Sequence, residues 1–359
     1  METVQDDQCV ITIGLGSLEK IDEFLLKYFG SNIAVLLLVD KHSCAYTLPV
    51  LQKQGAWVNS AFLLEVDGTE SSKQIETLCD LWKRWAELGV DRRAIVINLG
   101  GGALCDMGGL AASLYKRGLP FIQIPTTLLS MVDASVGGKT AVNLGELKNA
   151  LGLFVRPQAV FISPEFLKTL DLKEYLSGIA EIIKICMIRR KDFSVEGTNS
   201  FFCIDTLPES IINYAVKQKA EVVGMDFKEE GIRKILNFGH TFGHAFESHA
   251  LLVGHPIPHG WAVAYGLLCE LYLSMQCKGF PKTEFRLVCR CISKHYGQYY
   301  YDNHDIKKLV AYMRNDKKNK NAAIYPVLLS SYACCFYDEP VSEDSIIETL
   351  QAYPKFDMI

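Results

Sequence analysis

The sequence predicts an α/β N-terminal domain with a Rossmann-like parallel sheet, followed by an all-α C-terminal domain. In the first half, short apolar runs rich in branched residues alternate with stretches of helical periodicity. That alternation is typical of a parallel sheet whose strands are joined by crossover helices. From about Leu172 onward the periodicity is mostly helical. We therefore expect domains at residues 1–170 and 171–359, with a site in the cleft between them.

The expected strands are four apolar runs: IAVLLLVD at 33–40, AFLLEV at 61–66, AIVINL at 94–99 and FIQI at 121–124. Runs of this length and composition suit strands that are buried on both faces of a parallel sheet. A helix-like stretch at 71–88 separates the second run from the third.

Nucleotide-binding chemistry is indicated where two of these runs end. Gly100, Gly101 and Gly102 open a helix expected at 103–115. Glycines let a backbone approach a pyrophosphate, and a helix N-terminus favours an anion. The G-x-G-x-x-G spacing is absent, so a tight turn is the alternative. Asp40 closes the run at 33–40, where a carboxylate can accept ribose hydroxyls or serve as an ordinary turn residue.

Three histidines and a distant glutamate form the strongest chemical signal. They are His240 and His244 in LNFGHTFGHAFE, His259 in HGWAVAYG and Glu181 in SGIAEIIK. Imidazoles and a carboxylate suit a borderline-soft divalent ion such as zinc. Three protein ligands with an open position make a catalytic site, and four make a closed structural one. Core histidines with satisfied hydrogen bonds are the alternative.

Spacing predicts that the polar residues around His240 share one helix face. Intervals of four, three, four and three separate Arg233, Asn237, His240, His244 and Glu247. We expect this face to look onto a polar cavity.

Charged side chains also occur in two apolar helical stretches. Glu181 lies three residues before Lys184 in a helix that is apolar nearly all round, and such charges are rarely buried without a partner or a metal. An exposed ion pair is the alternative. Lys219 lies in an apolar stripe of ESIINYAVKQKAEVVGMD, where a snorkelling lysine is the alternative.

Composition excludes other classes of protein. The net charge is −4 and the pI about 6.1, which gives no nucleic-acid footprint. The 12 cysteines are scattered without a Cys-x-x-Cys pair, as in a reducing compartment. The polar start has no signal-peptide core, and the apolar runs are shorter than a membrane span. We expect a soluble cytoplasmic protein that binds neither membrane nor nucleic acid.

Taken together, the motifs resemble those of the 3-dehydroquinate synthase family. VDASVGGK, KNALG, SGIAEIIK, LNFGHTFGHAFE, the HisGly of HGWAVAYG and DKKN follow one another, and the match runs from about Asp40 to Asn319. The family belongs to the sugar phosphate cyclases, which share a fold with glycerol dehydrogenase. The resemblance implies a lyase of the shikimate pathway, in aromatic amino acid biosynthesis. It would convert 3-deoxy-D-arabino-heptulosonate 7-phosphate to 3-dehydroquinate and phosphate, with NAD and Zn²⁺ (or Co²⁺).

The same resemblance implies roles for individual residues. The metal ligands would be Glu181, His240 and His259, with His244 an active-site histidine that is not a ligand. The other substrate-binding positions would be Asp133, Lys139, Asn149, Lys184, Lys219, Arg233, Asn237 and Lys317 or Lys318. The NAD-binding positions in the N-terminal domain would be Asp40, Glu70, Lys73, Gly101, Gly102, Asp106, Thr126, Thr127 and Lys148. Arg117 would reach the neighbouring subunit's site, which implies a homodimer.

The chain departs from the family pattern at several positions. Trp261 stands where glutamate usually follows HisGly, Ala134 stands where serine is common, and His42 replaces an asparagine near the adenosine. The stretch before His259 is slightly long and adds His255, which precedes a proline and is expected in a loop. Three alternatives stay open: a cyclase for a substrate without a carboxylate, a metal-dependent polyol dehydrogenase, and a non-catalytic binding protein descended from the enzyme.

Overall fold

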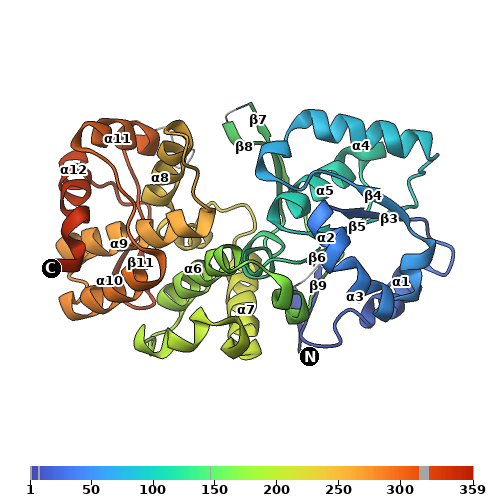
Figure 1. Cartoon of the computed structure of the whole chain (residues 1–359), viewed down its shortest axis with the longest axis horizontal. Helices are drawn as coiled ribbons and strands as arrows, with labels where there is room; N and C mark the ends of the chain where they lie inside the picture. Colours follow the sequence, from blue (N-terminus) through green and yellow to red (C-terminus); the bar gives the residue numbers. More distant parts are fainter. Residues whose placement is uncertain (1, 7–8, 146, 315–322, 359) are drawn as a thin grey trace. The chain divides into compact units, whose positions relative to one another are not determined.

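The structure, a computed structural model, describes residues 2–6, 9–145, 147–314 and 323–358. Its elements are labelled in Figure 1. The chain forms two compact units: Met1–Asp171 with Glu209–Lys228, and Leu172–Pro208 with Glu229–Ile359. The segment Glu209–Lys228 therefore groups with the first unit. The domains expected at 1–170 and 171–359 stay a prediction.

A sheet of seven strands forms the centre of the first unit. The strands are β1 (Glu2–Asp6), β2 (Cys9–Ile13), β3 (Val35–Val39), β4 (Phe62–Glu65), β5 (Ile95–Gly100), β6 (Phe121–Pro125) and β9 (Ala159–Ile162). Their order is β1-β2-β9-β6-β5-β3-β4, and every neighbouring pair is parallel except β1 with β2. The four predicted runs are β3, β4, β5 and β6, and the parallel sheet is confirmed. All five residues of β3 are buried, as expected for a strand that is covered on both faces.

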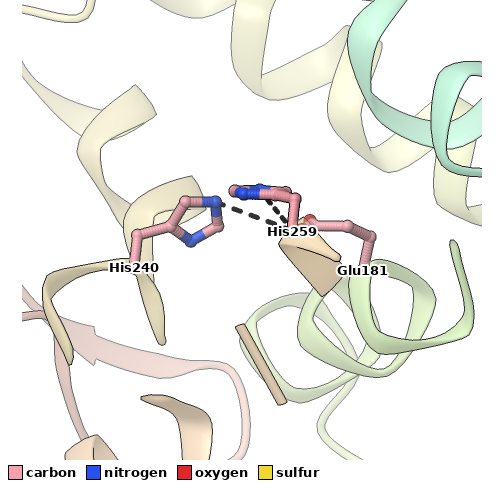
Figure 2. Close-up of side chains that lie close together, drawn as sticks. All are labelled: Glu181, His240 and His259. Carbon is pink, nitrogen blue, oxygen red and sulfur yellow. Dashed lines mark ion pairs between the residues drawn. The ribbon is translucent and has the colours of Figure 1, made fainter. Parts of the chain in front are cut away.

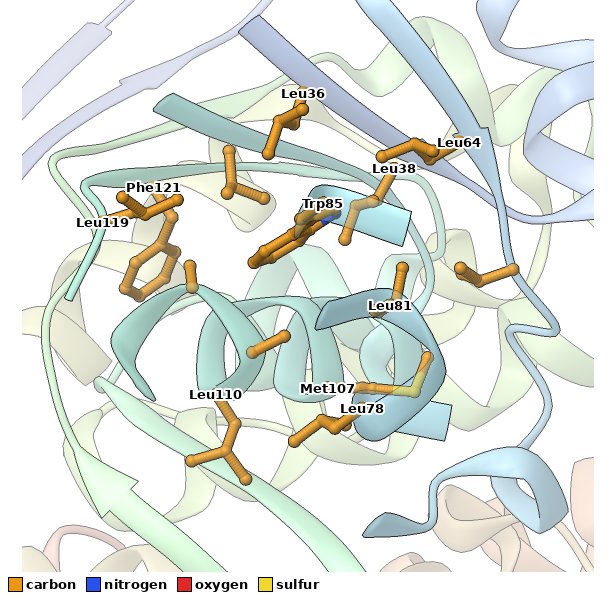
Figure 3. Close-up of a cluster of buried hydrophobic side chains, with 14 of the residues drawn as sticks. Leu36, Leu38, Leu64, Leu78, Leu81, Trp85, Met107, Leu110, Leu119 and Phe121 are labelled. Carbon is orange, nitrogen blue, oxygen red and sulfur yellow. The ribbon is translucent and has the colours of Figure 1, made fainter. Parts of the chain in front are cut away.

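Five helices of the first unit precede β6. They are α1 (Lys20–Phe29), α2 (Lys41–Tyr46), α3 (Leu48–Gln54), α4 (Ile75–Glu87) and α5 (Gly102–Leu114). Figure 3 shows the core between α4, α5 and the sheet. Trp85 of α4 is 0% exposed there and belongs to one buried cluster with Leu38 of β3 and Met107 of α5. Burying such side chains stabilises the fold by about 1.5–3 kcal/mol each.

A hairpin and one more helix also belong to the first unit. Strands β7 (Lys139–Leu144) and β8 (Leu147–Phe154) form an antiparallel hairpin that the sequence did not predict. Helix α7 (Glu209–Met225) packs against a π-helical turn at Ser130–Ala134.

The second unit is mainly helical. Its helices are α6 (Leu172–Arg189), α8 (His240–Leu252), α9 (His259–Lys278), α10 (Lys282–Tyr296), α11 (Ile306–Arg314) and α12 (Glu343–Ala352). It also contains a short hairpin, β10 (Leu328–Ser331) with β11 (Cys334–Phe336). Helix α9 contacts α6, α8, α10, α12 and β10. The four helices are labelled around it in Figure 1.

Glycines allow α9 to approach its neighbours very closely. A Cβ on Gly266 would lie 1.9 Å from the carbonyl oxygen of Gly239, and one on Gly260 would lie 2.0 Å from that of Ser177 on α6. Only residues without a side chain fit at such contacts. The first turn of α9 is fixed further because Trp261 Nε1 donates to the carbonyl of Lys173 at 3.2 Å.

The single helix face expected from Arg233 to Glu247 is wrong. A 3₁₀ helix at Ile232–Asn237 ends before Phe238, and Gly239 takes a φ of +81°. Helix α8 then begins at His240. Spacing alone does not register a left-handed residue, which breaks the helix and separates Arg233 and Asn237 from the histidines. Across the residues that the structure describes, none of the helices has the length and apolar character needed to cross a membrane.

Candidate active site

Glu181, His240 and His259 lie together in the second unit. Each offers one ligand atom, and these atoms all lie within 4.8 Å of one another. His240 Nε2 is 3.6 Å from Glu181 Oε1, and His259 Nε2 is 3.8 Å from the same oxygen. In Figure 2, dashed lines join both rings to the carboxylate. The three predicted ligands thus come from α6, α8 and α9, while their role as ligands stays a prediction.

In both imidazoles, Nδ1 lies near a hydrogen-bond acceptor, while Nε2 is the nitrogen nearer to Glu181. His240 Nδ1 is 3.1 Å from the carbonyl oxygen of Phe238, and His259 Nδ1 is 3.4 Å from Glu247 Oε2. Acceptors at Nδ1 place the proton there, which leaves the Nε2 lone pairs directed toward Glu181. A hydrogen-bonded Nδ1–H is the usual orientation of a metal-binding histidine.

The charge and burial of Glu181 suit the binding of a cation. Its side chain is 1% exposed, and Oε1 has no hydrogen-bond partner within the described ranges. Lys184 forms an ion pair with Oε2, so the exposed ion pair considered from sequence is wrong. The ligand atoms of two imidazoles and one carboxylate are thus close enough together for a divalent ion, which would keep a fourth position open.

Local sequence explains how these side chains reach one point. Helix α6 is buried nearly all round, so Glu181 is enclosed wherever it points. His240 follows the left-handed Gly239, and His259 follows Pro258, so each imidazole stands on the first residue of its helix.

His244, one turn along α8, lies beside the cluster. Its ring centroid is 5.3 Å from that of His240 and 6.0 Å from that of His259. His255 lies in the exposed loop before α9, as expected.

The 3₁₀ helix before α8 holds two further predicted positions. Arg233 is 2% exposed, and Asn237 Nδ2 donates to Glu229 Oε1 at 2.6 Å. Glu229 itself has a φ of +61°. No pattern in the sequence indicated Glu229 as a partner of Asn237.

Asp133 and Lys219 come together within the first unit. Lys219 is 7% exposed, forms an ion pair with the Asp133 carboxylate and donates to the Asp133 carbonyl at 2.6 Å. The snorkelling alternative is therefore wrong, because the ammonium group binds inside the unit where α7 meets the Ser130–Ala134 turn.

A second polar network in the first unit is centred on Lys73, which is 3% exposed. Its ammonium group lies 2.6 Å from Asp106 Oδ2 and donates to Asn149 Oδ1 at 2.6 Å. Burial raises the pKa of Asp106, and Lys73 offsets part of that rise. Asn143, which the sequence did not indicate, bonds both Glu70 and the backbone N–H of Asn149.

Several predicted nucleotide-binding residues lie at one edge of the sheet. Asp40 follows β3, Gly101 and Gly102 follow β5, and Thr126 and Thr127 follow β6. These three strands are adjacent and parallel, so the residues share the carboxyl edge. The chain leaves β3 toward β4 and leaves β5 toward β6, on the opposite side, so the edge is a topological switch point, where open α/β sheets bind ligands.

Glycines of this edge pack closely against neighbouring side chains. Asp40 caps α2 by accepting from the N–H of Ser43 at 2.7 Å through Oδ1. A Cβ on Gly68 would lie 2.7 Å from Asp40 Oδ2, and one on Gly102 would lie 3.2 Å from the Cβ of Ala134. Gly101 and Gly102 are only partly buried at the N-terminus of α5, where a helix end favours an anion such as a pyrophosphate.

The remaining predicted residues occupy exposed positions or lie outside the described ranges. Lys139 and Lys148 are exposed on the β7–β8 hairpin, and Arg117 is exposed after α5. Lys317 and Lys318 lie outside the described residues. The roles expected for these residues stay predictions.

The sequence matches the models of one protein family and is similar to several of its members. Models of the N-terminal and C-terminal parts of 3-dehydroquinate synthase match residues 63–177 and 178–319. The 3-dehydroquinate synthase of Parabacteroides distasonis is 40% identical over 325 residues, which cover 89% of this chain and 91% of that protein. The Dictyoglomus thermophilum enzyme of the same name is 35% identical over 354 residues, or 97% and 96% of the two chains.

Several solved structures share the fold of this chain. The 2-epi-5-epi-valiolone synthase ValA from Streptomyces hygroscopicus, with NAD⁺ and Zn²⁺ bound, gives a TM-score of 0.85 at 25% identity, covering 99% of this chain and 98% of its own. A 2-deoxy-scyllo-inosose synthase complexed with carbaglucose-6-phosphate, NAD⁺ and Co²⁺ gives 0.85 at 24% identity, with 98% and 99% covered. A probable glycerol dehydrogenase from Sinorhizobium meliloti gives 0.65 at 12% identity, with 98% and 97% covered, and so shares the fold alone.

Proposed function

The chain belongs to the 3-dehydroquinate synthase family, and on that premise we propose that it converts 3-deoxy-D-arabino-heptulosonate 7-phosphate to 3-dehydroquinate and phosphate. It would act as a phosphate-eliminating lyase of the shikimate pathway. The observation that carries the proposal is the grouping of His240 and His259 around the buried carboxylate of Glu181, with one ligand atom of each residue within 4.8 Å of the others.

The residues suit two bound groups, a divalent ion and NAD. Glu181, His240 and His259 would hold Zn²⁺ or Co²⁺, and relatives in fold carry those ions. The carboxyl edge of the sheet, with Asp40 and the glycines that open α5, would hold NAD. When bound, NAD accepts and returns a hydride, while the ion polarises the substrate's oxygens.

The chain's own residues bind and orient the substrate. We assign Arg233 and Lys219 to its carboxylate, because a buried guanidinium and a buried ammonium are strong partners for one. Asp133 fixes the Lys219 ammonium group by its carboxylate and its carbonyl. Phosphate binding is assigned to Lys139, Asn149, Asn237, His244 and Lys317 or Lys318. Fixing a flexible substrate in a reactive geometry lowers the barrier by about 7–11 kcal/mol.

We also propose a homodimer in which Arg117 reaches the neighbouring subunit's site. Lys116, Arg117 and Gly118 have consecutive positive φ values of 48°, 70° and 111°. Non-glycine residues adopt this region rarely, and such strain is common at functional positions. A dimer is tested by mixing an Arg117→Ala chain with an inactive His240→Ala chain, since restored activity requires shared sites. We place the protein in the cytoplasm, where the exposed thiols of Cys79, Cys203, Cys277 and Cys334 would stay reduced.

The deciding experiment measures phosphate release from the heptulosonate phosphate with substoichiometric NAD. We expect many turnovers per NAD, no NADH accumulation, and loss of activity with a chelator that is restored by Zn²⁺ or Co²⁺. A polyol dehydrogenase would instead accumulate NADH with a polyol, and a non-catalytic protein would release no phosphate. A cyclase for a substrate without a carboxylate would be insensitive to Arg233→Ala, whereas we expect a raised KM and a lowered kcat.

A further inference from the structure

Glu270, on α9, is a buried carboxylate that the proposed reaction does not use. Its side chain is 0% exposed. Oε2 accepts the backbone N–H of Gly239 at 2.8 Å, and Oε1 accepts the backbone N–H of Thr241 at 2.9 Å. The residue between these two amides is His240.

We propose that Glu270 is a positioning residue that fixes the imidazole of His240 for metal binding. The inference rests on the proposed function, because it presupposes an ion at Glu181, His240 and His259. Glu270 would contact neither the ion nor the substrate and would act through the backbone of α8.

The need for such a residue follows from how α8 begins. The first N–H groups of a helix have no partner within the helix. A serine, threonine or aspartate side chain usually accepts one of them, but Gly239 precedes His240 and has no side chain. Glu270 replaces the missing cap from another helix, and its charge suits the positive end of the α8 dipole.

The position of the Phe238–Gly239 peptide connects Glu270 to the imidazole. This peptide donates its N–H to Glu270 Oε2, and its carbonyl oxygen lies 3.1 Å from His240 Nδ1. Because a peptide group is planar, fixing its N–H also fixes the direction of its C=O. The bond from Thr241 N–H to Oε1 fixes the peptide on the other side of His240. Hydrogen bonds in such a series also strengthen one another.

Helix α9 therefore controls two of the three ligands. It carries His259 at its first residue and Glu270 about three turns later. The approach of α8 to α9 at Gly266 leaves little room for adjustment between them. A rotation of α9 would move His259 directly and His240 through Glu270.

The test measures the Co²⁺ affinity of the full-length, metal-stripped protein. Binding is monitored by visible absorption while a chelator competes for the ion. Glu270→Gln nearly keeps the shape but presents an NH₂ group to one of the two N–H donors. We expect its Co²⁺ affinity to fall about 10- to 100-fold, the usual effect of losing a group that orients a ligand. Tyr265→Phe is the matched control. Tyr265 lies on α9, as Glu270 does, and the change removes its buried hydrogen bond to the Tyr296 carbonyl. This variant should keep the parent Co²⁺ affinity.

The outcomes are distinguishable. Parent affinity in Glu270→Gln, or an equal loss in Tyr265→Phe, would overturn the inference while leaving the proposed function standing. If the His240→Ala variant still bound Co²⁺ with the parent affinity, both the inference and the proposed function would be overturned. If Glu270→Gln does not fold, hydrogen exchange of the parent decides: the Thr241 amide should be as protected as the core of α9, and exchange at the rate of an unstructured peptide would refute the role.

Discussion

Glu181 and Lys184 form an ion pair one turn apart on α6, with side chains that are 1% and 2% exposed. Two opposite charges buried together remain neutral as a pair, whereas either one alone would be strongly unfavourable. The glutamate therefore has a compensating charge before any ion arrives.

Replacing Lys184 should reveal that compensation. Lys184→Met leaves the Glu181 carboxylate unpaired, so we expect the metal-free protein to lose about 3–5 kcal/mol of unfolding free energy. With saturating Zn²⁺ the loss should be clearly smaller, because the ion supplies the positive charge. Urea denaturation with and without Zn²⁺ measures both values. Lys191→Met, at an exposed position after α6, is the control, and equal losses in both conditions would contradict the idea.

Glu247 should tune metal affinity through His259. Glu247→Gln replaces the carboxylate that lies 3.4 Å from Nδ1 by a weaker acceptor, so we expect Zn²⁺ affinity to fall at least about 10-fold. Competition with a chromophoric chelator measures it. Glu348→Gln, an exposed change on α12, serves as the control. Unchanged affinity in Glu247→Gln would show that the carboxylate does not orient the ring.

Gly266 should tolerate no side chain. In Gly266→Ala the new Cβ would meet the Gly239 carbonyl, forcing α8 away from α9, and we expect a loss of at least about 3 kcal/mol, beyond ordinary overpacking. Thermal and urea unfolding measure the loss. Gly197→Ala is the matched control, since its Cβ would meet nothing within 4 Å and no positive φ is involved there. Equal stability of the two variants would exclude a close helix contact.

Acid should remove a contribution made by Asp305. A hydrogen bond from Lys308, together with bonds from Asp302 N–H and His249, lowers the pKa of Asp305 from 3.8 to about 2. A depressed carboxyl pKa stabilises the fold above the unfolded value, and that stability is lost as the pH falls from 3.8 toward 2. We expect Asp305→Asn to cost about 1–2 kcal/mol at neutral pH.

The pH series provides the check for Asp305. The difference in unfolding free energy between parent and Asp305→Asn should shrink as the pH falls below about 4. Exposed Asp205→Asn is the control and should stay within about 0.5 kcal/mol of the parent at neutral pH. A difference that persists unchanged into acid would assign the effect to packing.

The sequence predicted those parts of the fold that depend on local pattern. Strands such as β3 were readable because consecutive buried positions must all be apolar. The β7–β8 hairpin was missed because most of β8 is exposed, so its apolar residues follow no burial pattern. The break at Gly239 was missed because residue spacing does not encode a positive φ.

The site was predicted by resemblance more than by physics. Nothing in the spacing of Glu181 and His259 indicates that their side chains meet, since that depends on the packing of α6 against α9. Glu270 carried the same local signal as Glu181, a carboxylate in an apolar helix, but its partners are backbone amides, which have no sequence signature.

Trp261, which departs from the family pattern, gives the second unit a natural optical reporter. The other tryptophans, Trp57, Trp82 and Trp85, all belong to the first unit. A chain in which those three are replaced by phenylalanine would emit from a single indole, two residues from His259 and anchored to the start of α6. Its quenching by paramagnetic Co²⁺ would then follow occupancy at the imidazoles in real time, without an added dye.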